Sequence, residues 1–164
     1  LITGYLFTAL ALLIASPFNA LLAEKAEEII TGRPIDSLEG FGPALMALPR
    51  GIIRELLKLL HYLPMFLLVL ILTVIPLTSP MSPLLWFILG AWMMSLQFVD
   101  YPMDNHQLSF TDVKKAIRSR RLSSMGFGGV VALFASVPIV NFFVVPSAVV
   151  GATLFWCEQL QHQE

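Results

Sequence analysis

Long apolar stretches alternate with short charged segments along this chain. Three stretches contain no Asp, Glu, Lys or Arg, and they cover residues 1–23, 61–99 and 122–157. A helix that spans a lipid bilayer needs about 20 mainly apolar residues. The pattern therefore predicts an all-α integral membrane protein with long transmembrane helices.

Helix-breaking residues interrupt the second and third stretches near their middles. They are Pro76, Pro80 and Pro83 in the second stretch, and Pro138, Asn141 and Pro146 in the third. We therefore expect two proline-turned helical hairpins over 62–99 and 122–157, with arms of about 14 to 17 residues, at or below the length of a bilayer span. A turn inside the membrane is tolerated only where protein or a water-filled cavity covers it. The hairpins are thus expected to be partly inserted and to pack in a homo-oligomer.

The first stretch predicts one membrane helix that extends into the cytoplasm, over residues 1–31. Ser16-Pro17 marks a kink, and the acidic and basic residues of 24–28 indicate that the helix then continues into water. The Thr31-Gly32-Arg33-Pro34 segment carries the glycine and proline that end helices. Because the chain opens without Met inside an apolar run, we expect it to be a fragment that lacks the beginning of this helix.

The distribution of basic residues predicts the orientation. All 10 Lys and Arg residues lie in the segments 24–61 and 100–121, which share one membrane face if both hairpins enter and leave on the same side. Positively charged loops mark the cytoplasmic side. We therefore assign 100–121 as a cytoplasmic basic segment of a multi-pass protein.

The composition agrees with one membrane domain over 1–164. Charged residues make up 13% of the chain and hydrophobic residues 57%, with a mean hydropathy of +0.78. Soluble domains carry about 25% charged residues. The net charge of -1 gives no indication of nucleic-acid binding, which requires a basic excess. No motif of an enzyme, a cofactor site or a metal site is present in the sequence, and Cys157 has no second cysteine to pair with.

A stripe of basic residues in the segment 43–61 is the main candidate for chemistry. Arg50, Arg54, Lys58 and His61 recur at spacings of four, four and three, which places them on one face of a helix. Glu55 lies beside the stripe, near enough to pair with Arg54 or Lys58. Cationic rings line anion pores, so the stripe is consistent with an anion path whose affinity Glu55 moderates. The alternative is an amphipathic helix at the membrane interface whose cations reach the lipid headgroups.

The segment 100–106 is a second polar cluster. Asp100, Asp104 and His106 lack a recognised metal-ligand spacing, and Pro102 is expected to interrupt a helix. We interpret the cluster, with Asn105, as a capping turn whose side chains bond nearby backbone amides.

Two further features of the sequence have ordinary membrane roles. The first is a basic run that we expect to bind anionic lipid, with collection of anions as the alternative. It consists of Lys114, Lys115, Arg118, Arg120 and Arg121. The second is a set of glycines in the hairpin predicted over 122–157, which favour close helix packing. They are Gly126, Gly128, Gly129 and Gly151.

Several motifs together resemble the CysZ sulfate permeases. They are Ser16-Pro17-Phe18-Asn19-Ala20-Leu21-Leu22-Ala23-Glu24, Pro49-Arg50 with Arg54-Glu55, Tyr62-Leu63-Pro64, Asp100-Tyr101-Pro102-Met103-Asp104-Asn105-His106, Phe127-Gly128, Pro138-Ile139-Val140-Asn141, Pro146, Gly151-Ala152-Thr153 and Trp156. The resemblance covers essentially the whole chain, and the segment 100–106 is its most specific part.

The resemblance implies an oligomeric protein of the bacterial inner membrane that imports sulfate for cysteine biosynthesis. It favours the anion-path interpretation of Arg50, Arg54, Glu55, Lys58 and His61, and makes Asn19 and Asn141 motif residues. The family also carries a Gly-Leu-Arg sulfate-binding loop that nothing in this chain matches, so we expect the primary sulfate site to lie outside these residues. The alternative to a transporter is a membrane scaffold whose basic cytoplasmic face binds lipid or a partner.

Overall fold

The computed structural model describes residues 18–34 and 48–161, and the regular elements in this part of the chain are helical. A first helix covers residues 18–31. The others are α3 (Leu48–Val74), the 3-10 turn η1 (Ser79–Met81), α4 (Ser82–Asn105), α5 (Phe110–Ser119), α6 (Arg121–Ala135), α7 (Pro138–Phe155) and the π-helical turn η2 (Trp156–Leu160). The predicted all-α class is confirmed.

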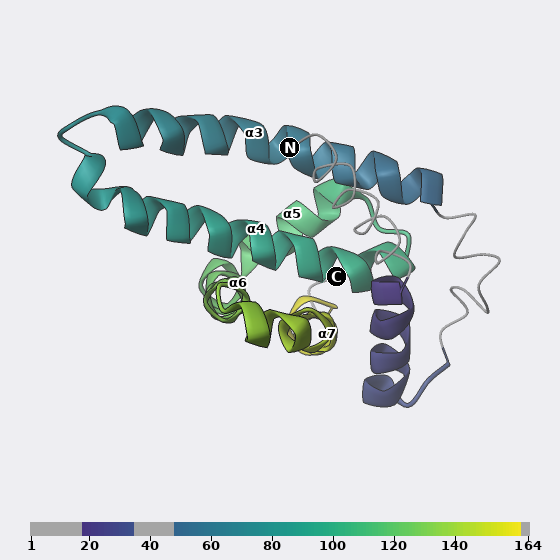
Figure 1. Cartoon of the computed structure of the whole chain (residues 1–164). Helices are drawn as coiled ribbons and strands as arrows, with labels where there is room; N and C mark the ends of the chain where they lie inside the picture. Colours follow the sequence, from purple (N-terminus) through teal and green to yellow (C-terminus); the bar gives the residue numbers. More distant parts are fainter. Residues whose placement is uncertain (1–17, 35–47, 162–164) are drawn as a thin grey trace.

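Helices α3 and α4 form a long antiparallel hairpin that projects from the rest of the molecule (Figure 1). The turn between them contains Pro76 and Pro80 of the predicted proline cluster, and Pro83 lies in the first turn of α4. The arms have 27 and 24 residues and are therefore longer than predicted, because the basic segment and the first arm are one helix that runs through Pro64. A break in a helix would leave backbone N–H and C=O groups without hydrogen-bond partners in lipid, which is costly. Membrane helices therefore tend to continue through a single proline.

Three helical segments are long and apolar enough to cross a membrane: Pro49–Val74, Ser79–Asn105 and Pro138–Leu160. The prediction of a membrane protein is confirmed. In the hairpin of α6 and α7, α6 is as short as the sequence predicts, with 15 residues, whereas the second arm is longer, because α7 continues through η2 into a helical segment of 23 residues, Pro138–Leu160. The turn of this hairpin lies just before Pro138, while Asn141 and Pro146 lie inside α7 and do not break it.

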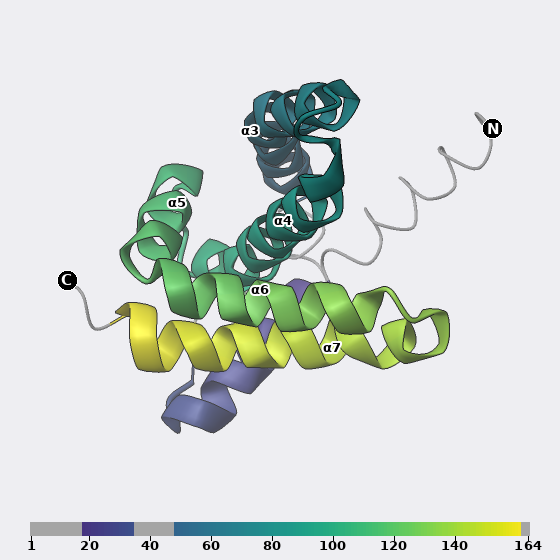
Figure 2. The ribbon, with the colours of Figure 1, turned by 90° about the vertical axis from the view of Figure 1, so that its left-hand side faces the viewer.

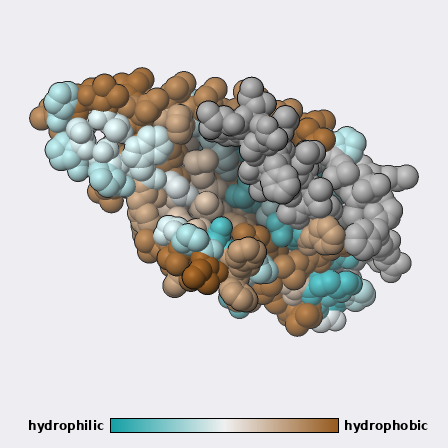
Figure 3. All heavy atoms as spheres, in the orientation of Figure 1, coloured by the Kyte–Doolittle hydropathy of each residue, from teal (hydrophilic) through white to brown (hydrophobic). Residues whose placement is uncertain are grey.

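The outer face of α3 is suited to contact with lipid. Figure 3 shows hydrophobic side chains along this helix at the upper edge of the molecule. Large apolar residues are exposed on it from end to end: Ile52, Ile53, Leu56, Leu59, Leu60, Leu63, Leu67, Leu68 and Ile71. In water this surface would drive aggregation, whereas hydrocarbon covers it at no cost.

Helix α4 is the centre of the fold, since α3, α5, α6 and α7 all pack on it. Figure 2 shows α6 and α7 side by side, crossing α4. Gly128 of α6 meets the α4 backbone, and a Cβ atom there would overlap the carbonyl oxygen of Ala91 and lie 2.8 Å from the amide nitrogen of Ser95. At this position the predicted packing role of the glycines is confirmed, because any side chain would separate the two helices.

Helix α5 is a short amphipathic helix between the two hairpins. It begins with a capping box, in which Ser109 and Asp112 each bond the other's backbone amide. Its buried side is formed by Phe110, Val113 and Ile117. The basic residues of the run predicted from the sequence lie on its remaining sides and at the start of α6.

Candidate functional site

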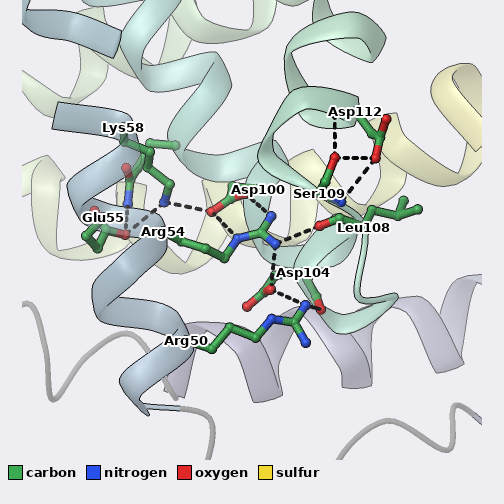
Figure 4. A network of polar contacts seen from close by, with 10 residues as sticks. Arg50, Arg54, Glu55, Lys58, Asp100, Asp104, Leu108, Ser109 and Asp112 are labelled. Carbon is green, nitrogen blue, oxygen red and sulfur yellow. Dashed lines mark hydrogen bonds and ion pairs between the residues drawn. The ribbon is translucent and has the colours of Figure 1, made fainter. Parts of the chain in front are cut away.

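A buried ion-pair network joins the basic stripe of α3 to two acidic residues of α4 (Figure 4). Arg54 is its centre. Its guanidinium pairs with both carboxylate oxygens of Asp100, lies 2.8 Å from Asp104 Oδ1, and donates a hydrogen bond of 2.7 Å to the carbonyl oxygen of Leu108. The side chains of Arg54 and Asp100 are 8% and 5% exposed, so both charges are removed from solvent.

Lys58 extends the network toward the middle of the hairpin. Its ammonium group lies 2.8 Å from Asp100 Oδ2 and 2.8 Å from Glu55 Oε1, and its side chain is 2% exposed. Gln97 of α4 donates a hydrogen bond of 3.3 Å to the same oxygen of Glu55. The predicted pairing of Glu55 with the stripe is therefore present, through Lys58.

Arg50 ends the network on the opposite side. It lies 2.6 Å from Asp104 Oδ1 and also donates to the backbone carbonyl oxygen of Asp104, at 3.0 Å. Its side chain is 42% exposed, far more than those of Arg54 and Lys58. Among these three cations, Arg50 is the one that a solute can reach without a rearrangement.

The network is balanced in charge. The three cations Arg50, Arg54 and Lys58 face three carboxylates, those of Glu55, Asp100 and Asp104. Removing an ion from water costs several kcal/mol, and only close opposite charges with additional hydrogen bonds compensate for this cost. The ion pairs therefore hold α3 and α4 together. As long as all of them are formed, the site has little net attraction for an anion.

His61, the fourth residue of the predicted stripe, lies apart from this network. Its ring packs edge-on against Phe110 of α5, with 5.9 Å between the ring centroids. Its Nε2 atom is buried without a hydrogen-bond partner among the described residues. The prediction that these residues line an anion path stays a prediction, but the structure divides them between two environments.

The interpretation of 100–106 as a capping turn is wrong for Asp100 and Asp104. Helix α4 continues through Pro102 to Asn105, and both carboxylates bond side chains of α3. The sequence contains a signal for this pairing, namely the spacing of the two acidic residues. The acids at 100 and 104 repeat the four-residue step of Arg50, Arg54 and Lys58, so that two facing helices present matching rows of opposite charge.

The motif residues around the network hold the helix 18–31 against the end of α4. Asn19 donates a hydrogen bond of 3.2 Å to Tyr101 Oη, and Asn105 donates one of 2.9 Å to the backbone carbonyl oxygen of Ala20. His106 Nε2 lies 2.7 Å from Glu27 Oε1. Glu24 and Glu27 are each 2% exposed, so the prediction that this helix continues into water is wrong for these two residues.

The contact between His106 and Glu27 predicts a pH dependence. The hydrogen bond to the Glu27 carboxylate raises the pKa of His106 above its ordinary value of 6.5, against the opposing effect of partial burial. A raised pKa means that the stabilisation is complete below pH 6.5 and is lost as the pH rises through the higher pKa of the folded state. We expect His106→Gln to lower the thermal unfolding temperature of the full-length protein in detergent at pH 6, and to lower it much less at pH 9. A difference that stays constant between pH 6 and pH 9 would contradict this role.

The fold and the site define an all-helical membrane protein whose two long hairpin arms are joined by buried ion pairs. The family model described as sulfate transporter CysZ/Etoposide-induced protein 2.4 matches residues 1–146, and the chain belongs to this family. The resemblance found in the sequence is thereby confirmed.

Three relatives show the extent of the similarity, and each is named sulfate transporter CysZ. The protein of Vibrio parahaemolyticus is 43% identical over 161 residues, which are 98% of this chain and 65% of the relative. A protein of Vibrio cholerae is 44% identical over 161 residues, or 98% and 64% of the two chains. One of Pseudomonas fluorescens is 41% identical over 153 residues, or 93% and 61%. The chain thus spans less than two thirds of the length of these relatives.

Proposed function

We propose that this chain forms part of a transporter that imports sulfate across a bacterial inner membrane, as the supply for cysteine biosynthesis. The observation that carries the proposal is the family match over residues 1–146, together with relatives that are named as sulfate transporters. The three apolar helical segments and the buried polar site between the first two of them support it, because charged groups within membrane segments mark the paths of ions and substrates.

Within this proposal, the α3–α4 network is the polar wall of the anion path. Arg50 contacts the anion, because its guanidinium is half-exposed and has a single carboxylate partner, which it shares with Arg54. Arg54 and Lys58 stay paired and keep the wall in place, while Glu55 limits the positive potential. An anion that competes with Asp104 for Arg50 binds weakly enough to leave again, which conduction requires.

Assembly as a homo-oligomer belongs to the same proposal. Helix α6 has 15 residues and is too short to span a bilayer alone. The exposed apolar residues near the α6–α7 turn include Phe134, Ile139, Phe142 and Phe143. A neighbouring copy would cover the backbone of this turn if the hairpin ends inside the membrane.

The test of the proposed path is sulfate uptake into vesicles that contain the full-length protein with Arg50→Gln. Loss of one charge-assisted hydrogen bond is worth about 1.5–3 kcal/mol, so we expect the rate at low sulfate to fall by about tenfold or more. Arg121→Gln is the matched control, because Arg121 is exposed and has no ion-pair partner among the described residues. Equal rates for wild type and Arg50→Gln, with both proteins folded, would remove Arg50 from the path.

A second candidate function is a membrane scaffold that does not transport. The charge balance of the network favours it, since a closed set of ion pairs needs no permeating ion to be stable. The scaffold predicts that neither wild type nor any of these variants supports sulfate uptake above protein-free vesicles.

A further inference from the structure

A second basic cluster lies between α3 and α5, outside the network just described. His61 of α3 and Lys114 of α5 both contact the ring of Phe110: the His61 ring at 5.9 Å between centroids, and Lys114 Nζ at 5.0 Å from the centroid. Arg118 follows Lys114 by one helical turn on α5. The positive charges of Lys114 and Arg118 both act on His61. His61 and Lys114 thus meet at the Phe110 ring, and Arg118 lies one helical turn further along α5, near enough to act on His61.

This cluster differs from the α3–α4 network because its charge is not compensated. Within residues 18–34 and 48–161, no carboxylate forms an ion pair with Lys114 or Arg118. The buried Nε2 atom of His61 has no hydrogen-bond partner there either. A buried polar nitrogen without a partner costs about 1–3 kcal/mol. Two unpaired cations and an unsatisfied nitrogen form a site that an anion would complete.

The surroundings of the cluster indicate where such an anion comes from. Helix α5 packs Phe110, Val113 and Ile117 into the protein core and carries its basic residues on the other sides, where a clustered set of cations can meet anionic headgroups. Toward the α3–α4 turn, the face of α3 beyond His61 is apolar, with Leu68 58% exposed. A basic cluster at the end of an apolar helix face matches a molecule with an anionic head and hydrocarbon chains.

We propose that His61, Lys114 and Arg118 bind the phosphoryl group of an anionic phospholipid. The phosphoryl oxygens accept hydrogen bonds from Lys114, from Arg118 and from the Nε2–H of a neutral His61 ring, while the acyl chains follow the apolar face of α3. Free sulfate and free phosphate share the tetrahedral oxyanion chemistry but lack the chains. The lipid is favoured over them because the apolar surface continues directly from the cluster.

The test measures thermal stabilisation of the full-length protein in detergent as phosphatidylglycerol is added, with phosphatidylcholine, inorganic phosphate and sulfate as parallel additions. A cation close to the surface of an anionic membrane contributes about 1 kcal/mol, which is about fivefold in affinity. We expect Lys114→Ala and Arg118→Ala each to weaken the response to phosphatidylglycerol about fivefold, and Lys114→Arg to restore it. Lys115→Ala is the matched control, since Lys115 is the adjacent lysine and lies 3.7 Å from the carboxylate of Asp112.

Each outcome decides the proposal. A response that requires phosphatidylglycerol and depends on Lys114 and Arg118 but not on Lys115 supports it. Equal losses for Lys114→Ala and Lys115→Ala would show that only the general charge of α5 acts, and would overturn the site. Stabilisation by inorganic phosphate or sulfate as strong as that by phosphatidylglycerol would overturn the assignment to lipid. A variant that unfolds without any lipid is replaced by His61→Gln, for which we expect the same loss of lipid response.

Discussion

Replacing Asp100 by Ala is expected to destabilise the full-length protein by about 3–5 kcal/mol, the largest effect of any single substitution in the hairpin. Asp100 is the shared partner of Arg54 and Lys58, whose side chains are 8% and 2% exposed. Without it, Arg54 keeps only Asp104 and Lys58 keeps only Glu55. Two buried cations would be undercompensated at the packed interface of α3 and α4.

The measurement is the thermal unfolding of the purified protein in detergent. Glu158→Ala is the matched control, because it removes the same charge from an exposed residue of η2 that has no ion pair among the described residues. The triple change Asp100→Leu, Arg54→Met and Lys58→Met should recover much of the loss, since apolar residues of similar volume replace buried ion pairs at little cost. If Asp100→Ala unfolded at the temperature of Glu158→Ala, the network would not be what joins α3 to α4.

The second large effect is expected from Gly128→Ala. The added methyl group would overlap the carbonyl oxygen of Ala91, which belongs to the backbone of α4 and cannot rotate away as a side chain can. Overpacking in a rigid core costs about 1–3 kcal/mol and occasionally more. Because the clash is with backbone at the crossing of α4 and α6, we expect about 3 kcal/mol and a hairpin displaced from α4.

The matched control for this change lies two residues earlier on the same helix. A Cβ atom at Gly126 would meet nothing within 4 Å, and Ala is a better helix former than Gly. We therefore expect Gly126→Ala to leave the unfolding temperature unchanged or slightly raised. Equal stability of the two variants would mean that α6 does not approach α4 as closely as the structure describes.

The helices of this protein were predictable because their sequence pattern is long and local. The uncharged apolar stretches predicted the two hairpins. The proline clusters predicted the positions of their turns, before Ser79 and before Pro138. The lengths of the first pair of arms were not predictable in the same way. Pro102 was expected to interrupt a helix, as proline does in soluble proteins, whereas α4 continues through it and α3 likewise continues through Pro64.

The candidate site could be predicted only in part, because it depends on contacts between distant segments. The four-residue spacing of Arg50, Arg54 and Lys58 showed that they share a face, and Glu55 was correctly placed beside them. The spacing did not show what that face meets. Asp100 and Asp104 lie 42 to 54 residues away from their partners, and only the packing of α3 on α4 reveals that they neutralise the stripe.

The separation of His61 from the other residues of the stripe also depends on contacts between distant segments. Periodicity groups His61 with Lys58, but α4 packs against one part of α3 and α5 against another. One face of α3 therefore contacts the acidic residues of α4 at one level and the basic helix α5 at another. The burial of Glu24 and Glu27 was missed for a related reason, since the polarity of a helix does not reveal that another helix covers it.

The most direct test of the account is the uptake of radiolabelled sulfate into vesicles that hold the full-length wild-type protein, beside protein-free vesicles of the same lipid. A sulfate transporter should give uptake well above the protein-free level, suppressed by an excess of unlabelled sulfate but not by an equal excess of chloride. Uptake at the protein-free level, from protein that unfolds cooperatively in the same preparation, would contradict sulfate transport and leave a membrane scaffold as the function.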